Sequence, residues 1–474
     1  MDLDRRTKIV CTIGPATASS AKMEALVRAG MDVARLNLSH GTREIHTEYI
    51  RHLRQTAAKL KFPLAILQDI PGPKVRTGEL AQPEVILQEG NRLTLTTRDV
   101  AGDQNEVSVN LPGLPQSVSA NDIVFLNDGA IKLQVEATTS TDVKCRVLVG
   151  GVLTKNRGIN VPNVTLKTPP FLEVNSQDLL FGIEHEVDFI ALSFVRDPHD
   201  VTEARKFLSE RGAEIPLIAK IEKWEACQQL DDIVAVSDGL MVARGDLGVE
   251  IPLEKVPLIQ KELIRKCNTS GKPVITATQM LESMIQNASP TRAEVTDIAN
   301  SIFDGTDAVM LSGETSIGRY PVEAVRVMAR VATETESALP YGKLIVERGT
   351  EAEPQTDEAI SYAACHTAYQ LGAAAIVAFT MSGSTARRVS RYRAGIPILA
   401  ATPSPSQRRR LLLSWGVYPY EVPEPDSVHE VFAQAAALSL KTGIASKGDL
   451  IVITAGLPIA VRGTTNLLKV ERLE

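Results

Sequence analysis

Short, nearly continuous apolar runs alternate with longer amphipathic segments over roughly the first 340 residues of the chain. Segments such as SAKMEALVRAG and TEYIRHLRQTAAKL repeat apolar residues at the three- and four-residue spacing of a helix. The apolar runs are typical of strands in a covered parallel sheet. Eight of them follow one another: TKIVCTIGPAT, MDVARLNLSH, PLAILQDI, VDFIALSFV, IPLIAKIE, DGLMVARGD, KPVITATQM and DAVMLSGET. Eight strands that alternate with helices predict an α/β fold with a (β/α)8 barrel, and a doubly wound open sheet is the main alternative.

One connection, between LQDI and LLFGIEHEVDFI, lacks the helical pattern. Its residues alternate between polar and apolar, as in EVILQEGNRLTLTT and DVKCRVLVGG, and include many turn residues. This pattern predicts a small all-β domain at residues 71–167, inserted after the third barrel strand. Loops that follow barrel strands open at the end of the barrel where catalysis occurs. We therefore expect the inserted domain to be a lid that excludes water from a bound substrate.

A polar, acidic stretch near residue 340 ends the barrel pattern, and a new alternation of helices and strands follows it. A helix is expected near residues 357–372 and another from Ser384 onward. Strands are expected at AAIVAFTM, IPILAAT, GDLIVITAG and NLLKVERL. These elements predict a C-terminal α/β domain at residues 341–474. Residues 1–70 and 168–340 are then the two parts of the barrel.

Composition excludes several classes of protein. A net charge of −6 argues against a general nucleic-acid binder, which would carry a basic excess. The five cysteines lack the spacing of a zinc site and, as an odd and dispersed set, fit buried thiols in a reducing compartment. The first residues, MDLDRRTKIV, lack the apolar core of a signal peptide, and no apolar run is long enough to cross a membrane. We expect a cytoplasmic protein with neither a membrane nor a nucleic-acid partner.

Polar side chains gather where the predicted barrel strands end, which is where barrels place their sites. Any one of them could be a solvated strand end, but so many at one rim indicate a functional site. They are Arg35, Asn37, Ser39, His40, Asp69, Lys74, Arg76, Ser193, Lys220, Glu222, Arg244, Asp246, Thr278, Ser312 and Glu314.

Two short motifs indicate the chemistry of this rim. In AKIE, Lys220 and Glu222 lie two apart in a strand and therefore point to the same side. Glu222 and Asp246, from neighbouring strands, form an oxygen-rich pair suited to Mg²⁺ or Mn²⁺. In ARGDLG, the glycines would let backbone N–H groups at a helix start approach an anion. Cations, metal ligands and amides without an evident nucleophile favour phosphoryl transfer.

With these motifs in place, the chain resembles the pyruvate kinase family over essentially its whole length. The matching stretches are TIGPAT, ARLNLSHG, ALSFVR, AKIE, MVARGDLGVE, TATQMLESMI, PTRAEVTD, DAVMLSGET and GTTN. MVARGDLGVE together with ATQMLESM is highly specific. The resemblance implies a barrel with an inserted β lid and a C-terminal regulatory domain. It also implies conversion of phosphoenolpyruvate and ADP to pyruvate and ATP.

The resemblance assigns roles to individual residues. It implies that Glu222 and Asp246 hold the divalent ion, and that Lys220 lies against the transferring phosphoryl group. Arg35 and Ser193 match phosphate-binding positions, and the amides of Gly245 and Asp246 match those that bind the carboxylate. Thr278, with Ser312 and Glu314 nearby, matches the group that protonates the enolate. The nucleotide positions are matched by Arg76, Arg157, Asn37 and His40. Lys155 is the less favoured alternative to Arg157.

The stretch LQDIPGPK departs from the family. Potassium-requiring members read LDTKGPE there, so Ile70 replaces a threonine and Lys74 replaces a glutamate. The monovalent ion of the family lies among oxygens that match Asn37, Ser39, Asp69 and residue 70. An ammonium carries the same unit charge as the ion and can donate to those oxygens. The hypothesis is that Lys74 takes the place of K⁺; a solvated lysine at the lid hinge is the alternative.

The loop FTMSGST precedes a predicted helix, and its hydroxyls and amides suit a phosphate. The family resemblance implies a phosphorylated sugar or nucleotide effector here, at Thr380, Ser382, Gly383, Ser384 and Thr385, and a homotetramer. A simple helix cap is the alternative for this loop. Two rival functions remain for the whole chain. One is a metal-dependent lyase or aldolase that uses a pyruvate enolate, and the other is an inactive sugar-phosphate sensor.

Overall fold

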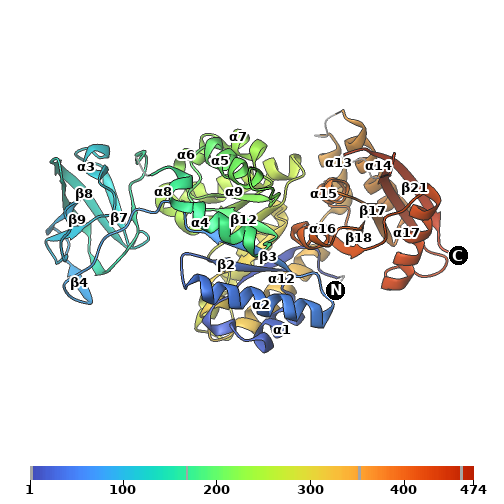
Figure 1. Ribbon diagram of the computed structural model, residues 1–474, viewed down its shortest axis with the longest axis horizontal. Coiled ribbons are helices and arrows are strands. Elements are labelled where there is room, and N and C mark those ends of the chain that lie inside the picture. The colour runs from blue at the N-terminus through green and yellow to red at the C-terminus, as the bar shows by residue number, and fades with distance from the viewer. Residues whose placement is uncertain (1–3, 167–168, 351–353, 460–462) are drawn as a thin grey trace.

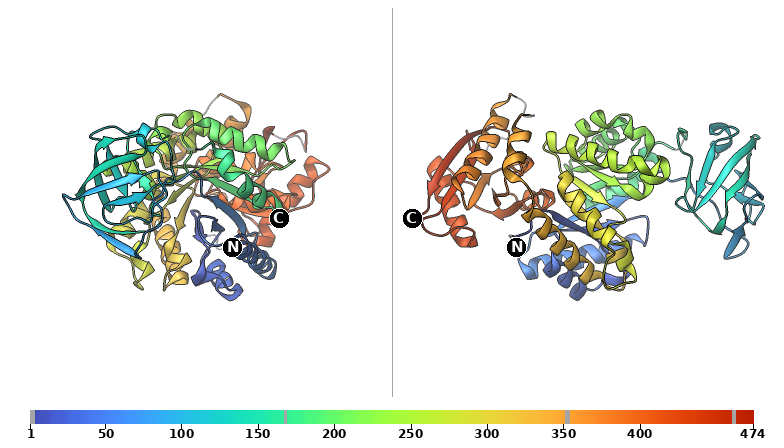
Figure 2. Two further views of the ribbon diagram at one scale, coloured as in Figure 1. Left: turned by 60° about the vertical axis from the view of Figure 1, so that its left-hand side comes forward. Right: turned by 180° about the vertical axis from the view of Figure 1, so that it is seen from behind.

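The computed structural model describes residues 4–166, 169–350, 354–459 and 463–474. Three bodies lie in a row, with a β-rich body at one end, a barrel in the middle and an α/β body at the other end (Figures 1 and 2). None of the described helices is both long and apolar enough to cross a membrane.

The central body is a closed barrel of eight parallel strands. Its first strand pairs with its last, from Lys8 beside Ala308 to Cys11 beside Leu311, and this closure excludes the open sheet. All eight strands come from the eight apolar runs: β1 Lys8–Thr12, β2 Val33–Asn37, β3 Ala65–Ile70, β12 Phe189–Leu192, β13 Leu217–Ile221, β14 Gly239–Ala243, β15 Val274–Ala277 and β16 Ala308–Leu311. The predicted barrel is confirmed.

The longer helices cover the outside of the barrel with their apolar faces. In α2, for example, Tyr49, Ile50 and Leu53 are buried, and Thr42 caps the first turn through its side chain. The helices of this body are α1 Ser20–Ala29, α2 Arg43–Leu60, α4 Phe171–Glu184, α5 Pro198–Ser209, α6 Trp224–Cys227, α7 Leu230–Val236, α8 Arg244–Glu250, α9 Val256–Thr269, α10 Arg292–Asp304, α11 Gly313–Ser316 and α12 Pro321–Ser337.

The segment between β3 and α4 folds into its own β body. A six-stranded sheet in the order β11-β7-β8-β9-β5-β6 and a two-stranded sheet, β10-β4, enclose a separate apolar core. The expected end of this domain, residue 167, lies outside the described residues. Its elements are β4 Glu84–Leu87, β5 Arg92–Thr96, β6 Glu106–Ser108, α3 Leu114–Ser117, β7 Ile123–Leu126, β8 Ile131–Thr138, β9 Asp142–Val149, β10 Gly151–Thr154 and β11 Ile159–Asn160.

The C-terminal body is a five-stranded sheet with the order β19-β18-β17-β20-β21, in which only β21 runs antiparallel to its neighbour among the described strands. The sequence patterns missed β19, where Pro419 interrupts a short run; an edge strand tolerates this proline. The elements are α13 Tyr341–Thr350, α14 Thr356–Leu371, β17 Ala375–Phe379, α15 Ser384–Arg391, β18 Ile398–Thr402, α16 Pro405–Arg410, β19 Val417–Glu421, α17 Val428–Thr442, β20 Leu450–Gly456 and β21 Thr465–Arg472.

A ring of four aspartates marks the N-terminal end of the barrel, and sequence reasoning had not singled it out. Around the barrel, every second strand is immediately preceded by one of these aspartates. Its carboxylate accepts the N–H of a residue at or next to the start of the strand before it, at 2.8–3.1 Å. Each also pairs with an arginine at 2.9–3.1 Å. The four pairs are Asp32 with Arg5, Asp188 with Arg54, Asp238 with Arg205, and Asp307 with Arg393.

The C-terminal body docks on this same end of the barrel. The run QRRRLLLSW forms the end of α16 and then a 3₁₀ turn, Leu411–Leu413, rather than one continuous helix. Leu412 and Leu413 are buried in one cluster with barrel-interior residues such as Val10. Arg409 donates to Asp188 at 2.6 Å. The basic segment is therefore part of the contact between the two bodies.

Candidate active site

Lys220 is the centre of a buried polar cluster at the C-terminal ends of the barrel strands. Its Nζ lies 2.9 Å from Glu222 Oε1 and 3.1 Å from Asp69 Oδ1, and it donates to Ser193 Oγ at 2.6 Å. Lys220 is only 8% exposed. Burial lowers the pKa of its ammonium, but Asp69 and Glu222 outweigh burial and raise it overall. Lys220 is therefore a fixed positive charge rather than a base.

Asp69 holds two of the predicted phosphate-binding residues in place. Arg35 Nε donates to its Oδ2 at 2.7 Å, and Ser193 Oγ donates to its Oδ1 at 3.1 Å. Thr12 accepts from Arg35 Nη1 at 2.9 Å and so fixes the far side of the guanidinium. Burial raises the pKa of Asp69, but Lys220 and Arg35 lower it overall. The structure brings together Arg35, Ser193 and Lys220, as the sequence predicted.

Glu222 and Asp246 form the candidate metal site. Glu222 follows β13, and its Oε2 accepts the N–H of Phe194 at 2.7 Å. Burial raises the pKa of Glu222, and the nearby charge of Asp246 adds to this rise. A divalent ion would offset the repulsion between these carboxylates. No group of three or more histidine, cysteine or acidic side chains suited to a metal occurs among the described residues, so water and substrate would complete the shell.

Thr278 is held in a strained conformation beside the start of α8. Its φ is +68°, an uncommon value for a β-branched residue. Its Oγ1 accepts the N–H of Gly245 at 2.8 Å, and its carbonyl accepts from Arg244 at 2.7 Å. Arg244 is itself anchored by Asp297 at 2.7 Å. The hydrogen bonds of Thr278 with Gly245 and Arg244 thus hold the strained conformation in place, which is typical of a functional position.

Glu314 holds the loop that follows Thr278. Its two carboxylate oxygens accept the N–H groups of Leu281, at 3.0 Å, and Ser312, at 2.7 Å. Burial raises its pKa although these two hydrogen bonds lower it. The Oγ of Ser312 is buried and has no partner among the described residues. Glu314 is therefore placed to position the loop, and the hydroxyl of Ser312 remains available to a ligand or water.

The candidate nucleotide residues lie on two segments at the base of the β body. A bridge between Arg76 and Gly158 places these segments side by side. Arg157 Nε donates to Thr154 Oγ1 at 2.5 Å, and Lys155 pairs with Glu79 at 3.3 Å. On the loop after β2, Asn37 Oδ1 accepts the N–H of Ser39 at 3.2 Å, and the carbonyl of His40 accepts from His46 at 2.8 Å.

Lys74 lies at a different carboxylate from the one that the potassium hypothesis named. Its Nζ is 3.3 Å from Asp246 Oδ1 and 3.5 Å from Asp128 Oδ1. Asn37, Ser39 and Asp69 are not among its described contacts. Packing against the β body explains this placement. The Lys74 side chain lies against Gly158, where an added Cβ would come within 2.7 Å of Lys74 Cε. The lysine thus faces the candidate metal ligand Asp246. Ile70 is fully buried.

The loop after β17 forms a small pocket in the C-terminal body. Thr380 and Thr385 are buried, and Gly383 has a φ of +83°. Ser382 Oγ donates to Ser384 Oγ at 3.1 Å. Thr385 shares a 2.8 Å hydrogen bond with Thr465, whereas the buried Oγ1 of Thr380 has no partner among the described residues. The pocket, about 50 Å³, is lined by these hydroxyls.

Comparisons with known proteins agree along the whole chain. The family model "Pyruvate kinase, barrel domain" matches residues 4–325, and "Pyruvate kinase, alpha/beta domain" matches residues 358–471. This chain belongs to the pyruvate kinase family. It is therefore an enzyme of the phosphotransferase class.

Individual relatives give the same result. The pyruvate kinase of Geobacillus stearothermophilus is 48% identical over 472 residues, which are 99% of this chain and 80% of the relative. The pyruvate kinase of Clostridium acetobutylicum is 44% identical over 99% of this chain and 100% of its own length. The crystal structure of a pyruvate kinase from Cryptosporidium parvum covers 100% of this chain and 98% of its own, with a TM-score of 0.94 and 37% identity.

Sequence reasoning missed several residues that support this candidate site. Thr12 orients Arg35, the backbone of Phe194 orients Glu222, and Asp128 contacts Lys74. Thr12 ends a strand like the other rim residues, so its position could have indicated it. A backbone N–H in a loop and a residue of an inserted domain carry no comparable signal.

Proposed function

We propose that this chain transfers the phosphoryl group of phosphoenolpyruvate to ADP and releases pyruvate and ATP. The observation that carries the proposal is the cluster around Lys220, in which one buried ammonium is shared by Asp69, Ser193 and Glu222. Phosphoryl transfer needs fixed positive charge and exact positioning more than a nucleophile. The attraction between two opposite unit charges about 4 Å apart is worth roughly 4 kcal/mol at an effective dielectric constant of about 20.

Three side chains would bind the transferring group. Lys220 would lie between the donor and acceptor oxygens, and Arg35 and Ser193 would hold the remaining phosphoryl oxygens. Asp69 keeps all three in register, because it contacts each of them. The amides of Gly245 and Asp246, at the start of α8, would bind the substrate carboxylate.

Glu222 and Asp246 would hold Mg²⁺ or Mn²⁺, which supplies positive charge to the phosphoryl and enolate oxygens when it is bound. The two carboxylates fit such an ion because they repel each other and because the remaining ligands can be water and substrate.

Loss of the phosphoryl group leaves an enolate, whose carbon must gain a proton to give pyruvate. The Thr278 hydroxyl would deliver this proton through water. Ser312 and Glu314 would order this path of proton transfer, because Glu314 accepts the backbone N–H groups of both Ser312 and Leu281. Loss of Thr278 should slow protonation more than transfer.

The β body would close over the site and carry Arg76 and Arg157 to the phosphates of ADP, with Asn37 and His40 on the barrel side. Of the two basic candidates in this stretch, Lys155 already pairs with Glu79, which supports Arg157. Closure would exclude water and prevent hydrolysis of the transferred group.

The charge of Lys74 would make the reaction independent of K⁺. Its ammonium lies beside Asp246, so it adds a permanent unit charge next to the substrate site. This support differs from the expected contacts with Asn37, Ser39 and Asp69. In both placements Lys74 adds one positive charge beside the site.

A phosphorylated sugar or nucleotide would bind and activate through Thr380, Ser382, Gly383, Ser384 and Thr385. The buried, unpartnered hydroxyl of Thr380 in this pocket supports the assignment over a simple helix cap. We further propose a homotetramer that works in the cytoplasm.

Measuring pyruvate release from phosphoenolpyruvate tests the proposed reaction. We expect release that requires both ADP and Mg²⁺ and produces one ATP for each pyruvate. Removal of the divalent ion with a chelator should abolish it, and added Mg²⁺ or Mn²⁺ should restore it. Pyruvate release without ADP would instead support a lyase. No turnover, combined with binding of sugar phosphates, would support an inactive sensor.

A further inference from the structure

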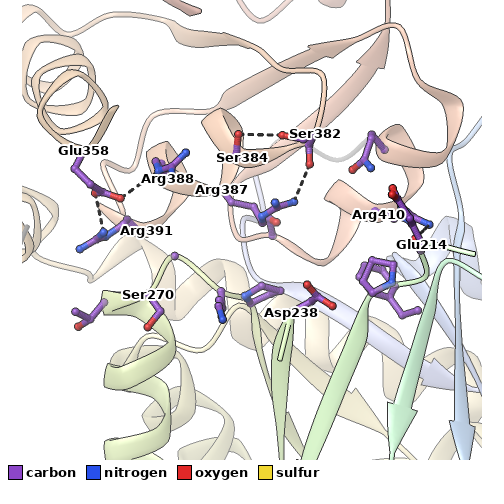
Figure 3. Close-up of a pocket in the computed structure, with 18 of the residues that line it drawn as sticks. Glu214, Asp238, Ser270, Glu358, Ser382, Ser384, Arg387, Arg388, Arg391 and Arg410 are labelled. Carbon is purple, nitrogen blue, oxygen red and sulfur yellow. Dashed lines mark hydrogen bonds and ion pairs between the residues drawn. The ribbon is translucent and has the colours of Figure 1, made fainter. Parts of the chain in front are cut away.

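A cavity of about 570 Å³ lies between the barrel and the C-terminal body (Figure 3). From the barrel it is lined by residues that directly precede β13, β14 and β15, including Pro216, Asp238 and Lys272. It therefore lies at the N-terminal end of the barrel, opposite the candidate active site. From the C-terminal body it is lined by α15 and α16, with Arg387 and Arg410. This volume is within the range of small-molecule sites.

Two of the five cations around this cavity are neutralised by acids of the C-terminal body. Arg391 pairs with Glu358 at 2.7 Å, and Arg388 pairs with Asp357 at 2.7 Å and with Glu358 at 3.3 Å. Figure 3 shows Glu358 between the two arginines, at one side of the cavity. These cations and acids form a closed structural network.

The other three cations, Lys272, Arg387 and Arg410, have no carboxylate within 4 Å among the described residues. They donate to backbone carbonyls: Arg387 to that of Ser382 at 3.3 Å, Arg410 to that of Glu214 at 2.7 Å, and Lys272 to those of Val234 and Ala235 at 2.5 and 2.9 Å. The buried Nε of Arg410 has no partner among those residues.

The acids of the cavity compensate these three charges only in part: Asp238 raises the pKa of each of them, but burial outweighs it. Asp238 is already used by Arg205, at 2.9 Å, and by the N–H of Leu217, at 2.8 Å. Glu214 is exposed and meets Arg410 through its backbone carbonyl.

Burial lowers the pKa of all three cations. Arg388 and Arg410 lower the pKa of Arg387 further, and Arg387 lowers that of Lys272, so the charge of Arg387 is close enough to be repelled by those of Arg410 and Lys272. An anion among them would relieve both the burial and the repulsion.

We propose that this cavity binds a small phosphorylated sugar, with its phosphate among Lys272, Arg387 and Arg410. Guanidinium groups match the geometry of phosphate oxygens. The hydroxyls of Ser270, Ser382 and Ser384 line the rest of the cavity and suit a polyhydroxylated group. Among its described lining residues the only aromatic ring, Phe189, is 4% exposed, so a nucleobase would find no stacking surface.

This site is separate from the proposed effector pocket and does not depend on the proposed reaction. Ser382 and Ser384 line both cavities, on opposite sides of one loop, but Thr380 lines only the effector pocket, and the three cations line only the larger cavity. Because Lys272 belongs to the barrel and both arginines belong to the C-terminal body, a ligand here would join the two bodies.

Calorimetric titration of the full chain tests the proposal, with glucose 6-phosphate, inorganic phosphate, adenosine monophosphate and glucose as separate probes. We expect glucose 6-phosphate to bind most tightly and glucose not to bind. Arg387→Gln and Arg410→Gln should each weaken binding of glucose 6-phosphate at least tenfold. Arg408→Gln is the matched control, because Arg408 lies on the same helix, pairs with Glu421 and does not line the cavity. Thr380→Val, which changes only the effector pocket, should leave the slowing of hydrogen exchange by glucose 6-phosphate in residues 269–274 unchanged.

Unchanged binding in both cavity variants would overturn the proposal, as would absence of saturable binding for every probe. Equal or tighter binding of inorganic phosphate or adenosine monophosphate at this cavity would overturn the sugar assignment. Hydrogen exchange of the unmodified protein makes the test independent of how the variants fold. Glucose 6-phosphate should slow exchange in residues 269–274 and 384–391 together, and protection that omits residues 269–274 would contradict the site.

Discussion

At the N-terminal end of the barrel, four aspartates are each matched to at least one backbone N–H and at least one guanidinium. At the C-terminal end, Asp69 and Glu222 share the ammonium of Lys220, and burial together with the charge of Asp246 raises the pKa of Glu222. The same residue types therefore do different work at the two ends. Separate, saturated pairs stabilise the fold, whereas crowded charges with too few partners can bind a metal and an anionic substrate.

The difference has a simple physical origin. A carboxylate whose hydrogen bonds are complete gains nothing from an added ion, so such a pair contributes to stability alone. A carboxylate that is buried beside another is held at a higher free energy until a cation arrives. Changes at the two ends of the barrel should therefore separate activity from stability.

The largest expected effect is on activity at the C-terminal end. Lys220→Met removes the charge shared by Asp69, Ser193 and Glu222, and we expect kcat to fall at least 10³-fold, on the scale of losing a principal electrostatic group. Steady-state assays of ATP formation measure this change. Lys343→Met, on an exposed position of α13, is the control and should keep full activity. Turnover of Lys220→Met at the rate of the unmodified enzyme would refute the assigned site.

The counterpart at the N-terminal end is Asp307→Asn. Asp307 accepts from Val274 and Trp415 and pairs with Arg393, which is 2% exposed, so the variant leaves a buried guanidinium without its counter-charge. We expect a loss of about 3–5 kcal/mol in the free energy of unfolding. Denaturant titration measures it. The kcat of the folded fraction should change less than twofold, and a large drop in kcat would contradict the division between the two ends.

Asp69→Asn sharpens the comparison because Asp69 is at the catalytic end but is satisfied like the aspartates of the other end. Burial raises its pKa, but Lys220 and Arg35 lower it overall, so its carboxylate stabilises the fold above its unfolded pKa of about 3.9. That stabilisation is lost as the pH falls through the lower folded value. We expect the unmodified protein to exceed the variant by about 1–3 kcal/mol at pH 7.

Urea unfolding of both proteins between pH 7 and pH 3 measures this difference. The gap should shrink steadily below pH 4. A gap that stayed constant over this range would show that the carboxylate charge of Asp69 is not the stabilising element.

Much of this arrangement could be predicted from sequence, for local reasons. Strands buried in a barrel need continuous apolar runs, so all eight were visible, and the two-residue period of a strand put Lys220 beside Glu222. The aspartate ring was not visible, since a single aspartate before a strand resembles an ordinary turn residue. Arg393, the partner of Asp307, comes from another body, and only the docking of that body on the barrel brings the two residues together.

Lys74 was recognised as unusual, but its partner was not. Its neighbours depend on the direction in which the inserted β body leaves the barrel, and a local pattern does not encode that direction. The contacts with Asp246 and Asp128 come from two different bodies of the molecule.

The smallest expected effect is also the one that tests this departure from the potassium-requiring sequences. In K⁺-free buffer the unmodified enzyme should be stimulated less than twofold by added K⁺, because Lys74 already supplies a unit charge at Asp246. Lys74→Glu replaces that charge with a third acid near Asp246 and Asp128 and should create a stimulation of tenfold or more. Lys74→Met separates the two causes, since it removes the ammonium without adding an acid. If the lost charge is decisive, Lys74→Met should also gain a K⁺ requirement. If the lysine is only a solvated hinge residue, both variants should respond to K⁺ as the unmodified enzyme does.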